Sequence, residues 1–239
     1  MTDPDPNGLL NLYKPVGKSS AHYVYKLRSV FGIRKVGHSG TLDPFADGVL
    51  VACIGRGTKL VERLMDLPKL YRTTLRLGIT NTTYDTEKPF EPVPGASPQE
   101  LSAIESALSA MTGLVQQVPP AFSAVRIGGI QSYKLAKEGK TAPRQSRQVR
   151  IDRIDILAYD WPTLSLDILC GRGTYIRAIA RDLGKTLACG ACCETLQRRA
   201  VGPFRIEDAV DLQTASPDSV RAAFIPLDDA LQRIAPNSP

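Results

Sequence analysis

The sequence predicts a mixed α+β fold, and strand-like and helix-like patterns in separate segments agree with that class. Apolar and polar side chains alternate over residues 71–77, as in a half-buried antiparallel strand. Residues 149–159 and 164–170 are predicted to form two further strands, joined by a turn near Trp161 and Pro162. Other stretches carry apolar residues at helical spacing. These patterns agree with an α+β class without proving it.

Two shorter strands are predicted nearer the N-terminus. Residues 9–13 form an apolar strand that runs into a turn over residues 14–17. Residues 49–54 form an apolar run bounded by glycines, which predicts a strand buried on both faces. A buried segment of helix would give the same run, so periodicity alone leaves both interpretations open.

Three helices are predicted from capping residues followed by apolar side chains at helical spacing. Their expected caps and ends are Ser19 or Ser20 to Gly32, Thr58 to Pro68, and Ser97 to Gly113. In the third helix, Ser97 and Glu100 form a capping box, with Pro98 at the first helical position. A fourth helix is expected to open at residues 171–177 and to bury Ile176, Ile179, Ala180 and Leu183.

Length and composition are sufficient for a packed core. The chain has 239 residues, of which 43% are hydrophobic, enough for one large domain or two small ones. No apolar run approaches the roughly 20 residues that a membrane helix needs, and the acidic N-terminal residues do not fit a signal peptide. We therefore expect a cytoplasmic protein without a membrane span.

The five cysteines favour free thiols in a reducing compartment, because their number is odd and the chain is too large to need disulfides. Cys189 and Cys192 form a C-x-x-C pair beside Cys193, so a zinc site or a redox pair is an alternative. The two histidines do not stand at zinc-finger spacing. We expect these cysteines to pack in the core, and we expect no metal.

The positive charge is concentrated in one segment. Residues 119–153 contain eight basic and two acidic residues. The net charge of this segment is therefore +6, which equals the net charge of the whole chain. Flexible and aromatic residues, including Tyr133, separate the charges, which favours an element that follows a phosphate backbone. A solvated basic loop is the alternative interpretation.

Residues 37–59 predict a functional loop followed by its supporting strand. Gly37, Gly40 and Gly48 permit sharp turns, and Pro44 favours an extended conformation for the residue before it. Asp43 is therefore expected on a loop. A turn-forming role, in which its carboxylate accepts nearby backbone N–H groups, is the simpler interpretation of an Asp-Pro pair.

The order of motifs resembles the TruB family of tRNA pseudouridine synthases over roughly residues 7–227. Residues 37–44, Gly-His-Ser-Gly-Thr-Leu-Asp-Pro, match the G-H-x-G-x-L-D-P signature of that family. The Lys-Pro-x-Gly-x-Ser-Ser arrangement starting at Lys14 resembles its first motif, and Gly-Thr-Tyr-Ile-Arg at residues 173–177 resembles its K/R-G-T-Y-I-R motif. The chain departs from the family at residues 81–83, Asn-Thr-Thr, where a Thr-Asp-Thr run is usual, although Asp85 still aligns.

This resemblance implies a fold and a domain organisation. The fold would be the pseudouridine synthase fold, a long, curved, mostly antiparallel mixed sheet flanked by helices, with a central active-site cleft. Residues 1–239 would form a single catalytic domain in which residues 119–150 are a basic RNA-binding insertion. Most bacterial relatives continue into a small RNA-binding PUA domain, which we do not expect here because the sequence ends at residue 239.

The resemblance also implies an activity: isomerisation of uridine to pseudouridine at position 55 in the T arm of tRNA, after the base is flipped out of the RNA. Asp43 would be the nucleophile, Tyr71 would stack on the base and help to remove a proton, and Arg177 would form a salt bridge with Asp43. The substrate-binding residues would be His38, Tyr175, Leu196, Lys14, Asp85, Arg126 and Lys134. Arg198 and Arg199 are additional candidates for phosphate contacts. We expect a monomer without cofactor or guide RNA.

Three other functions fit part of the sequence. The chain could be the catalytic subunit of an H/ACA guide-RNA complex, although that subunit needs its terminal RNA-binding domain. It could be a non-catalytic RNA-binding or tRNA-folding protein, which would have no need for Asp43, Tyr71 and Arg177 together. It could also be a hydrolase in which Asp43 and Asp47 act as paired carboxylates. Whether Asp43 would attack the uracil ring or the ribose carbon is open.

Overall fold

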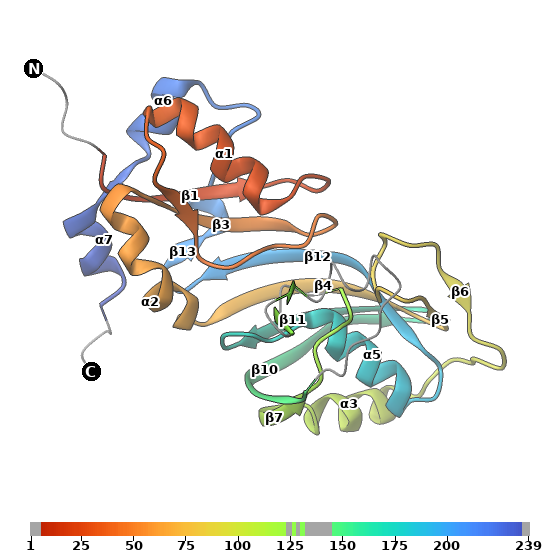
Figure 1. Cartoon of the computed structure of the whole chain (residues 1–239). Helices are drawn as coiled ribbons and strands as arrows, with labels where there is room; N and C mark the ends of the chain where they lie inside the picture. The colour runs from red at the N-terminus through yellow and green to blue at the C-terminus, as the bar shows by residue number, and fades with distance from the viewer. Residues whose placement is uncertain (1–5, 123–125, 128–129, 132–144, 236–239) are drawn as a thin grey trace, which may run out of the picture. The chain divides into compact units, whose positions relative to one another are not determined.

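The computed structural model describes residues 6–122, 126–127, 130–131 and 145–235. The chain divides into two compact units (Figure 1). Unit 1 comprises Met1–Leu70 and Gln197–Pro239, and unit 2 comprises Tyr71–Leu196. The division falls within strand β4 (Lys69–Leu77) and within strand β12 (Ala191–Val201), so each of these strands contributes to both units.

Unit 1 is built on two long antiparallel strands, β1 (Gly8–Lys14) and β3 (Asp47–Ile54), which pair along the whole of β1. Strand β14 (Val210–Asp211) runs parallel to β1, and the last part of β12 pairs with β3 in parallel through Gln197 and Arg198. The other elements are α1 (Ser20–Phe31), β2 (Val36–His38), the 3-10 helix η1 (Gly55–Leu60), α2 (Val61–Asp66), β13 (Phe204–Arg205), η2 (Ile206–Asp208), α6 (Pro217–Ala222), β15 (Ile225–Pro226) and α7 (Leu227–Arg233).

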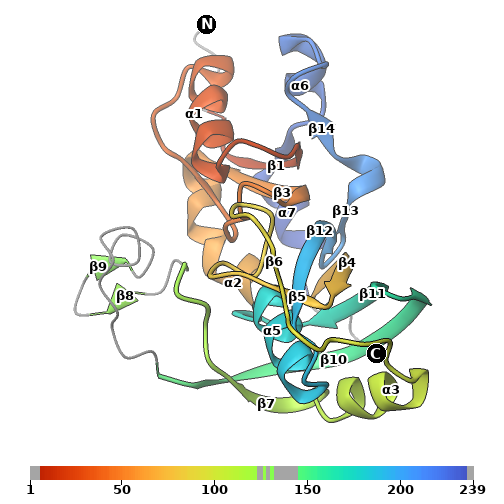
Figure 2. The same ribbon diagram turned by 90° about the vertical axis from the view of Figure 1, so that its right-hand side faces the viewer.

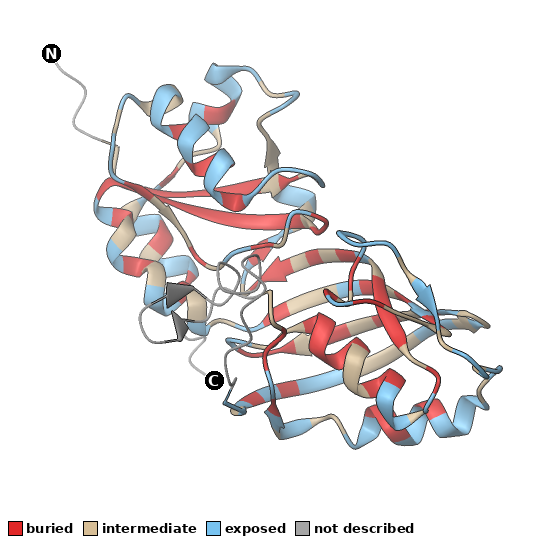
Figure 3. Ribbon diagram, turned by 45° about the vertical axis from the view of Figure 1, so that its right-hand side comes forward, coloured by how far each residue is buried: buried red, intermediate tan, exposed pale blue. Residues whose placement is uncertain are grey.

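Both faces of this sheet are covered, which is why β1 and β3 carry almost continuous apolar sequence. Helices α1 and α6 lie on the same side of β1 (Figures 1 and 2), where Leu10, Leu12 and Leu50 pack with Tyr23 and Leu27. The opposite face packs against η1, α2 and α7 through a second cluster: Leu9, Val49, Val51, Leu60, Leu64, Ala230 and Ile234. Figure 3 shows β1 and β3 as buried strands. The predicted strand over residues 49–54 is confirmed, together with its burial on both faces.

The first predicted helix is confirmed and the second begins differently. Ser19 caps α1 by accepting the backbone N–H of His22, and Gly32 ends the helix in a left-handed conformation. Thr58 was expected to cap the second helix, which is wrong: it lies inside η1 and its hydroxyl donates to the carbonyl of Gly55 at 2.8 Å. The chain already turns at Gly55, because that residue has a φ of 57° that glycine tolerates.

Unit 2 contains a sheet in the order β12, β4, β11 (Thr163–Cys170), β10 (Arg147–Asp160) and β7 (Gly113–Gln117), in which β10 runs antiparallel to both β11 and β7. Residues of β4 and β11 alternate between buried and more exposed positions, so the predicted strands over residues 71–77, 149–159 and 164–170 are confirmed. The remaining elements are β5 (Ile79–Thr80), β6 (Glu91–Pro92), α3 (Leu101–Ser109), β8 (Arg126–Ile127), β9 (Ile130–Gln131) and α5 (Ile176–Thr186).

Helix α3 contacts both α5 and β10 (Figure 2), and α5 buries the four side chains predicted for it. The predicted capping box of Ser97 and Glu100 is wrong, because α3 begins at Leu101 without a side-chain cap. The reason is a tertiary contact: the hydroxyl of Tyr159 accepts the N–H of Gln99 at 3.0 Å and donates to its carbonyl at 2.7 Å. The α+β class, with its mixed and mostly antiparallel strands flanked by helices, is confirmed. The predicted cleft stays a prediction.

Candidate active site

Asp43 lies on the loop between β2 and β3, here called the Asp43 loop (residues 39–46), and is half-buried. The loop is closed by a turn in which Ala46 donates to the carbonyl of Asp43 at 3.1 Å. At its start, the backbone N–H of Ser39 donates to Val51 of β3 at 3.0 Å. The N–H of Gly17, in the turn after β1, donates to Pro44 at 2.7 Å. Asp43 is therefore presented from a backbone that is fixed at several points.

Ser20, the first residue of α1, holds the middle of the loop. Its hydroxyl donates to the carbonyl of Leu42 at 3.2 Å and accepts the N–H of the same residue at 2.9 Å. Because Ser20 is buried at 1% exposure, water does not compete for these bonds. The residue next to Asp43 is thereby tied to a regular helix.

Lys14 holds the end of the loop from inside unit 1. Its side chain is 0% exposed, and its ammonium donates to the carbonyls of Ala46 at 2.7 Å and Pro15 at 2.9 Å. Burial lowers the pKa of Lys14 to about 8, although the carboxylates of Asp47 and Asp43 act in the opposite direction. Lys14 was predicted as a substrate contact. The geometry gives it a positioning role, and direct contact with substrate stays a prediction.

Arg198, on β12, binds the start of the Asp43 loop and the strand β3 that follows the loop. It is 2% exposed, and its guanidinium donates from Nε to Val49 at 2.7 Å and from Nη2 to Gly40 at 3.1 Å. Arg198 was predicted as a candidate phosphate contact. Its side chain is buried within unit 1, so the geometry gives it a supporting role for the loop, and contact with phosphate stays a prediction. Arg199, the other candidate, pairs with Glu207 at 2.7 Å.

Asp47, the first residue of β3, joins three strands. Its Oδ2 accepts the hydroxyl of Tyr13 at 2.6 Å and the side-chain amide of Gln197 at 2.8 Å. Burial and this hydrogen bond raise the pKa of Tyr13 to about 12. From the sequence, Asp47 was considered as a second catalytic carboxylate, and the pairing of this residue with Tyr13 of β1 and Gln197 of β12 was missed. No local sequence pattern could have revealed a partner 150 residues away.

His38 ends β2 and is half-buried just before the loop. Burial lowers the pKa of its imidazole, and the positive charge of Arg198 lowers it further. A neutral ring at physiological pH suits the predicted contact with displaced bases better than an imidazolium, because a neutral ring loses less hydration on stacking. That contact stays a prediction.

In unit 2, Arg177 and Asp85 form a buried ion pair. The distance from Nη1 of Arg177 to Oδ2 of Asp85 is 3.2 Å, and the two side chains are 3% and 1% exposed. The guanidinium also donates to the carbonyls of Thr83 at 3.0 Å and Phe122 at 2.8 Å. Asn81 shapes the segment that carries Asp85, because its side-chain amide donates to the carbonyl of Asp85 at 2.7 Å and its oxygen accepts the N–H of Thr83 at 3.1 Å.

Tyr175 lies at the N-terminus of α5 and is fixed by its backbone. Gln117 accepts the N–H of Tyr175 at 2.8 Å and donates to its carbonyl at 3.2 Å. The guanidinium of Arg147 lies 4.9 Å from the centre of the Tyr175 ring and donates to Gly173 at 2.5 Å. This is a cation–π contact at the motif that resembles K/R-G-T-Y-I-R.

The structure brings together some of the predicted site residues and leaves others as predictions. Leu196 is buried at 6% exposure, and Tyr71 is half-buried in β4. The predicted ion pair of Arg177 with Asp43 would join residues of different units and stays a prediction. Arg126 belongs to the short strand β8, which pairs with β9, whereas Lys134 lies outside the described residues.

All five cysteines are free and buried, as the packing interpretation predicted. Burial raises the pKa of the thiols of Cys53, Cys192 and Cys193 to about 12, which keeps them protonated and unreactive. Among the described residues, no group of three or more His, Cys, Asp or Glu side chains is placed to hold a metal ion. Within the same part of the chain, no helix has the length and hydropathy needed to cross a membrane.

A known structure shares this fold. A crystal structure of a Cbf5-Nop10-Gar1 complex contains a chain that is 23% identical to this protein, with a TM-score of 0.72. The match covers 98% of this chain and 68% of the other. The two chains therefore share a fold, and the family model that matches this chain describes a pseudouridylate synthase, the class that the sequence motifs implied.

Comparison with protein families identifies the chain more closely. Residues 28–176 match the model of the TruB family pseudouridylate synthase (N terminal domain). The tRNA pseudouridine synthase B of Clostridium novyi (strain NT) is 40% identical over 227 residues, which cover 95% of this chain and 78% of the relative. The tRNA pseudouridine synthase B of Syntrophobacter fumaroxidans (strain DSM 10017 / MPOB) is 39% identical, with coverage of 98% and 78%. This chain belongs to the TruB family.

Proposed function

We propose that this chain isomerises uridine to pseudouridine at position 55 in the T arm of tRNA, with Asp43 as the nucleophile. Membership of the TruB family and 40% identity to a tRNA pseudouridine synthase B support the activity and the class of RNA. The observation that carries the catalytic assignment is the Asp43 loop, whose backbone is held by the buried side chains of Lys14, Ser20 and Arg198.

The reaction breaks the glycosidic C–N bond, turns the base and forms a C–C bond through carbon 5. A carboxylate that captures the ring or the sugar divides this difficult step into two easier ones. Such a nucleophile must be held close to its target, since misplacement by about 1 Å can cost 100-fold in rate. Three buried hydrogen-bonding side chains around one short loop supply that restraint.

The residues of unit 2 complete the proposal. Tyr71 stacks on the uracil and helps to remove the proton from carbon 5, and Tyr175 and Leu196 line the pocket. Arg177 keeps Asp43 ionised, because an opposite charge lowers the pKa of a carboxylate. The buried ion pair with Asp85 supports this role, since it fixes the direction of the guanidinium. His38 occupies the space that the flipped base leaves.

The RNA is bound without a guide RNA and by a monomer in the cytoplasm. Residues 119–150, which contain Arg126 and Lys134, follow the backbone of the T-arm stem-loop. The cation–π contact of Arg147 with Tyr175 supports a link between this insertion and the site residues of unit 2. Formation of pseudouridine in a mixture of only this protein and the substrate RNA would establish that no guide RNA is needed.

The test is tritium release from a T-arm stem-loop transcript labelled at carbon 5 of uridine. The wild-type protein is expected to release one tritium for each pseudouridine formed. Asp43→Asn is expected to release none while it binds the same transcript with a Kd within about twofold of wild type, because the amide keeps the shape of the loop. Full activity in that variant would contradict the assignment. Binding by wild type without any release would identify an RNA-binding protein and not a synthase.

A further inference from the structure

A second basic segment lies near the N-terminus, apart from the insertion at residues 119–150. Between Pro6 and Leu42 the sequence contains six basic residues and neither aspartate nor glutamate. Lys14 is buried, whereas the other five side chains are exposed: Lys18, Lys26, Arg28, Arg34 and Lys35. A segment of this length without an acid carries a positive charge that its own sequence does not offset.

Within the described residues of unit 1, these exposed cations form no ion pair, although other exposed arginines do form pairs, such as Arg199 with Glu207. The neighbouring helix α6 contributes Asp218, but that carboxylate is paired with Arg221 at 3.1 Å. The positive charge of this face is therefore available to a partner.

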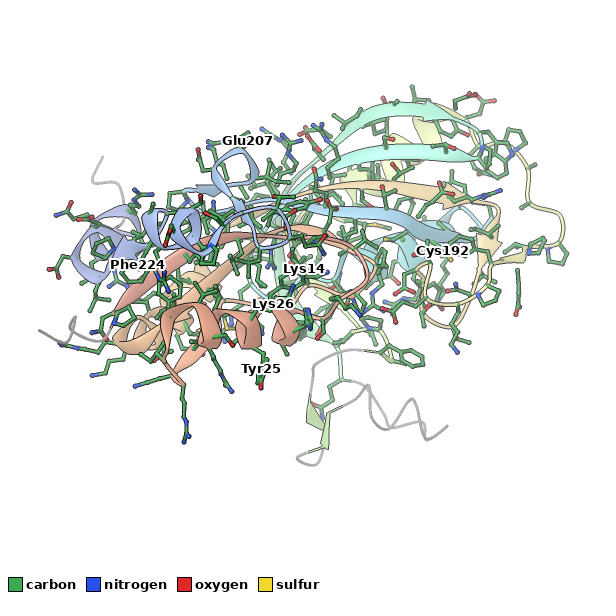
Figure 4. All side chains as sticks on the ribbon, turned by 90° about the horizontal axis from the view of Figure 1, so that it is seen from above. Lys14, Tyr25, Lys26, Cys192, Glu207 and Phe224 are labelled. Atoms are coloured by element: carbon green, nitrogen blue, oxygen red, sulfur yellow. The ribbon has the colours of Figure 1, made fainter. Side chains whose placement is uncertain are left out.

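Two of the cations, Lys26 and Arg28, share the exposed side of α1 with aromatic rings, and Lys18 lies just before the helix. We call Lys18, His22, Tyr25, Lys26 and Arg28 the α1 surface. Tyr25 is 67% exposed and projects outward from the helix (Figure 4), with the guanidinium of Arg28 6.0 Å from the centre of its ring. Exposed rings between cations are typical of surfaces that bind nucleic acid, because bases stack on the rings while the cations bind phosphates.

The α1 surface begins beside the Asp43 loop. Gly17, next to Lys18, donates to Pro44, and Ser20 at the start of α1 bonds to Leu42, so the turn before α1 and its first residue contact the residues on either side of Asp43. From Ser20 to Arg28 the surface extends along α1 by about 12 Å. An RNA whose target base reaches Asp43 would have phosphates within that span.

We propose that the α1 surface binds the phosphate backbone of the RNA substrate, as a contact separate from the insertion at residues 119–150. The inference rests on the proposed function, because it takes the RNA that reacts at Asp43 as the partner. Its recognition is electrostatic and independent of base sequence, since it uses flexible lysine and arginine side chains.

The experiment compares two triple variants with wild type by filter binding of unmodified tRNA from about 50 to 200 mM salt. In Lys18→Gln/Lys26→Gln/Arg28→Gln, Kd at low salt is expected to rise about tenfold or more, and the slope of log Kd against log salt to fall by about two to three. The control Arg63→Gln/Arg205→Gln/Arg233→Gln removes the same charge from exposed positions elsewhere in unit 1. Its Kd is expected to stay within about threefold of wild type.

Several results would overturn the proposal. Unchanged Kd and slope in the α1 variant would do so, as would equal losses in both variants, which would indicate an effect of net charge alone. If the α1 variant bound phosphatidylserine vesicles more weakly than wild type but bound RNA equally well, the surface would be assigned to a membrane instead. Thermal unfolding of both variants should match wild type, because the substituted side chains form no ion pairs among the described residues. Tritium release by wild type is measured in parallel, so that a failure of the synthase assignment is seen separately from a failure of the α1 contact.

Discussion

The guanidinium of Arg177 lies 3.2 Å from the carboxylate of Asp85, and both side chains are almost completely buried. Two carbonyl groups, those of Thr83 and Phe122, accept hydrogen bonds from the same guanidinium. A buried guanidinium needs such partners, because removal from water costs several kcal/mol that only close opposite charge and hydrogen bonds offset. Asp85 thus determines where the arginine of the Gly-Thr-Tyr-Ile-Arg motif points.

Replacement of Asp85 by alanine is expected to lower the free energy of unfolding by about 3–5 kcal/mol, because it leaves a buried guanidinium without its carboxylate. Urea denaturation measures the change. The matched control is Asp152→Ala, which breaks the pair of Arg150 and Asp152 at 3.0 Å, where the side chains are 55% and 31% exposed. Exposed pairs contribute about 0–1 kcal/mol, so equal losses in both variants would show that the buried pair does not stabilise unit 2.

Lys14 is expected to make stability depend on pH in a narrow alkaline window. Its pKa is about 8 in the folded chain and has an ordinary value of 10.5, so between these values the unfolded chain binds more protons and stability rises with pH. Lys14→Met lacks this titrating group. Between pH 8 and 10.5, the unfolding free energy of wild type should therefore rise relative to that of Lys14→Met by up to about 3 kcal/mol. Parallel pH curves for the two proteins would contradict the low pKa.

The buried thiols are expected to act in the opposite direction. Cys53, Cys192 and Cys193 have pKa values of about 12 in the folded chain against an ordinary value of 9.0. Above pH 9 the unfolded chain therefore loses protons first, and stability falls as pH rises toward 12. Cys53→Ala should reduce that slope by up to about 1.4 kcal/mol per pH unit. Guanidinium denaturation under reducing conditions at pH 8–10.5 measures it, and an unchanged slope would show that the Cys53 thiol titrates normally.

Local sequence patterns predicted the helices and strands whose bounds depend on their own residues. Residues 49–54 read as a doubly buried strand, because helices cover both faces of β3, and Ser19 and Gly32 bound α1 through their own backbone chemistry. Thr58 and Ser97 are equally good caps by composition, yet Gly55 and Tyr159 fix the neighbouring backbone first. Tertiary contacts override propensity at such positions.

The motifs predicted the location of the Asp43 loop but not its supports. Lys14 and Arg198 are charged, so exposure to RNA was the natural expectation, and their burial depends on carbonyl groups that the fold brings to them. Strand β12 was not predicted, because polar residues interrupt its alternation. It also pairs with β3, which lies about 150 residues earlier in the chain. Pairings over such separations leave no local pattern.

Gly48 is expected to be essential for the support of the Asp43 loop, and Gly17 provides the matched comparison. Both have similar positive φ angles, 109° and 104°, so alanine carries a similar backbone strain of about 1–3 kcal/mol at either position. A Cβ at Gly48 would lie 2.3 Å from the carbonyl oxygen of Arg198 and 2.7 Å from its nitrogen, whereas a Cβ at Gly17 meets nothing within 4 Å. Gly48→Ala must therefore push β12 away from β3 and move the Arg198 guanidinium from Gly40 and Val49.

We expect Gly48→Ala to lower the unfolding free energy by at least about 2 kcal/mol more than Gly17→Ala does, because overpacking against backbone adds to the strain. Tritium release should fall at least about tenfold in Gly48→Ala at a temperature where it remains folded, since the loop that carries Asp43 loses the hydrogen bond from Arg198 to Gly40. Urea denaturation and the release assay on both variants measure these effects. If the two variants lost stability and activity equally, backbone strain would explain the result and the contact of Gly48 with Arg198 would have no special role.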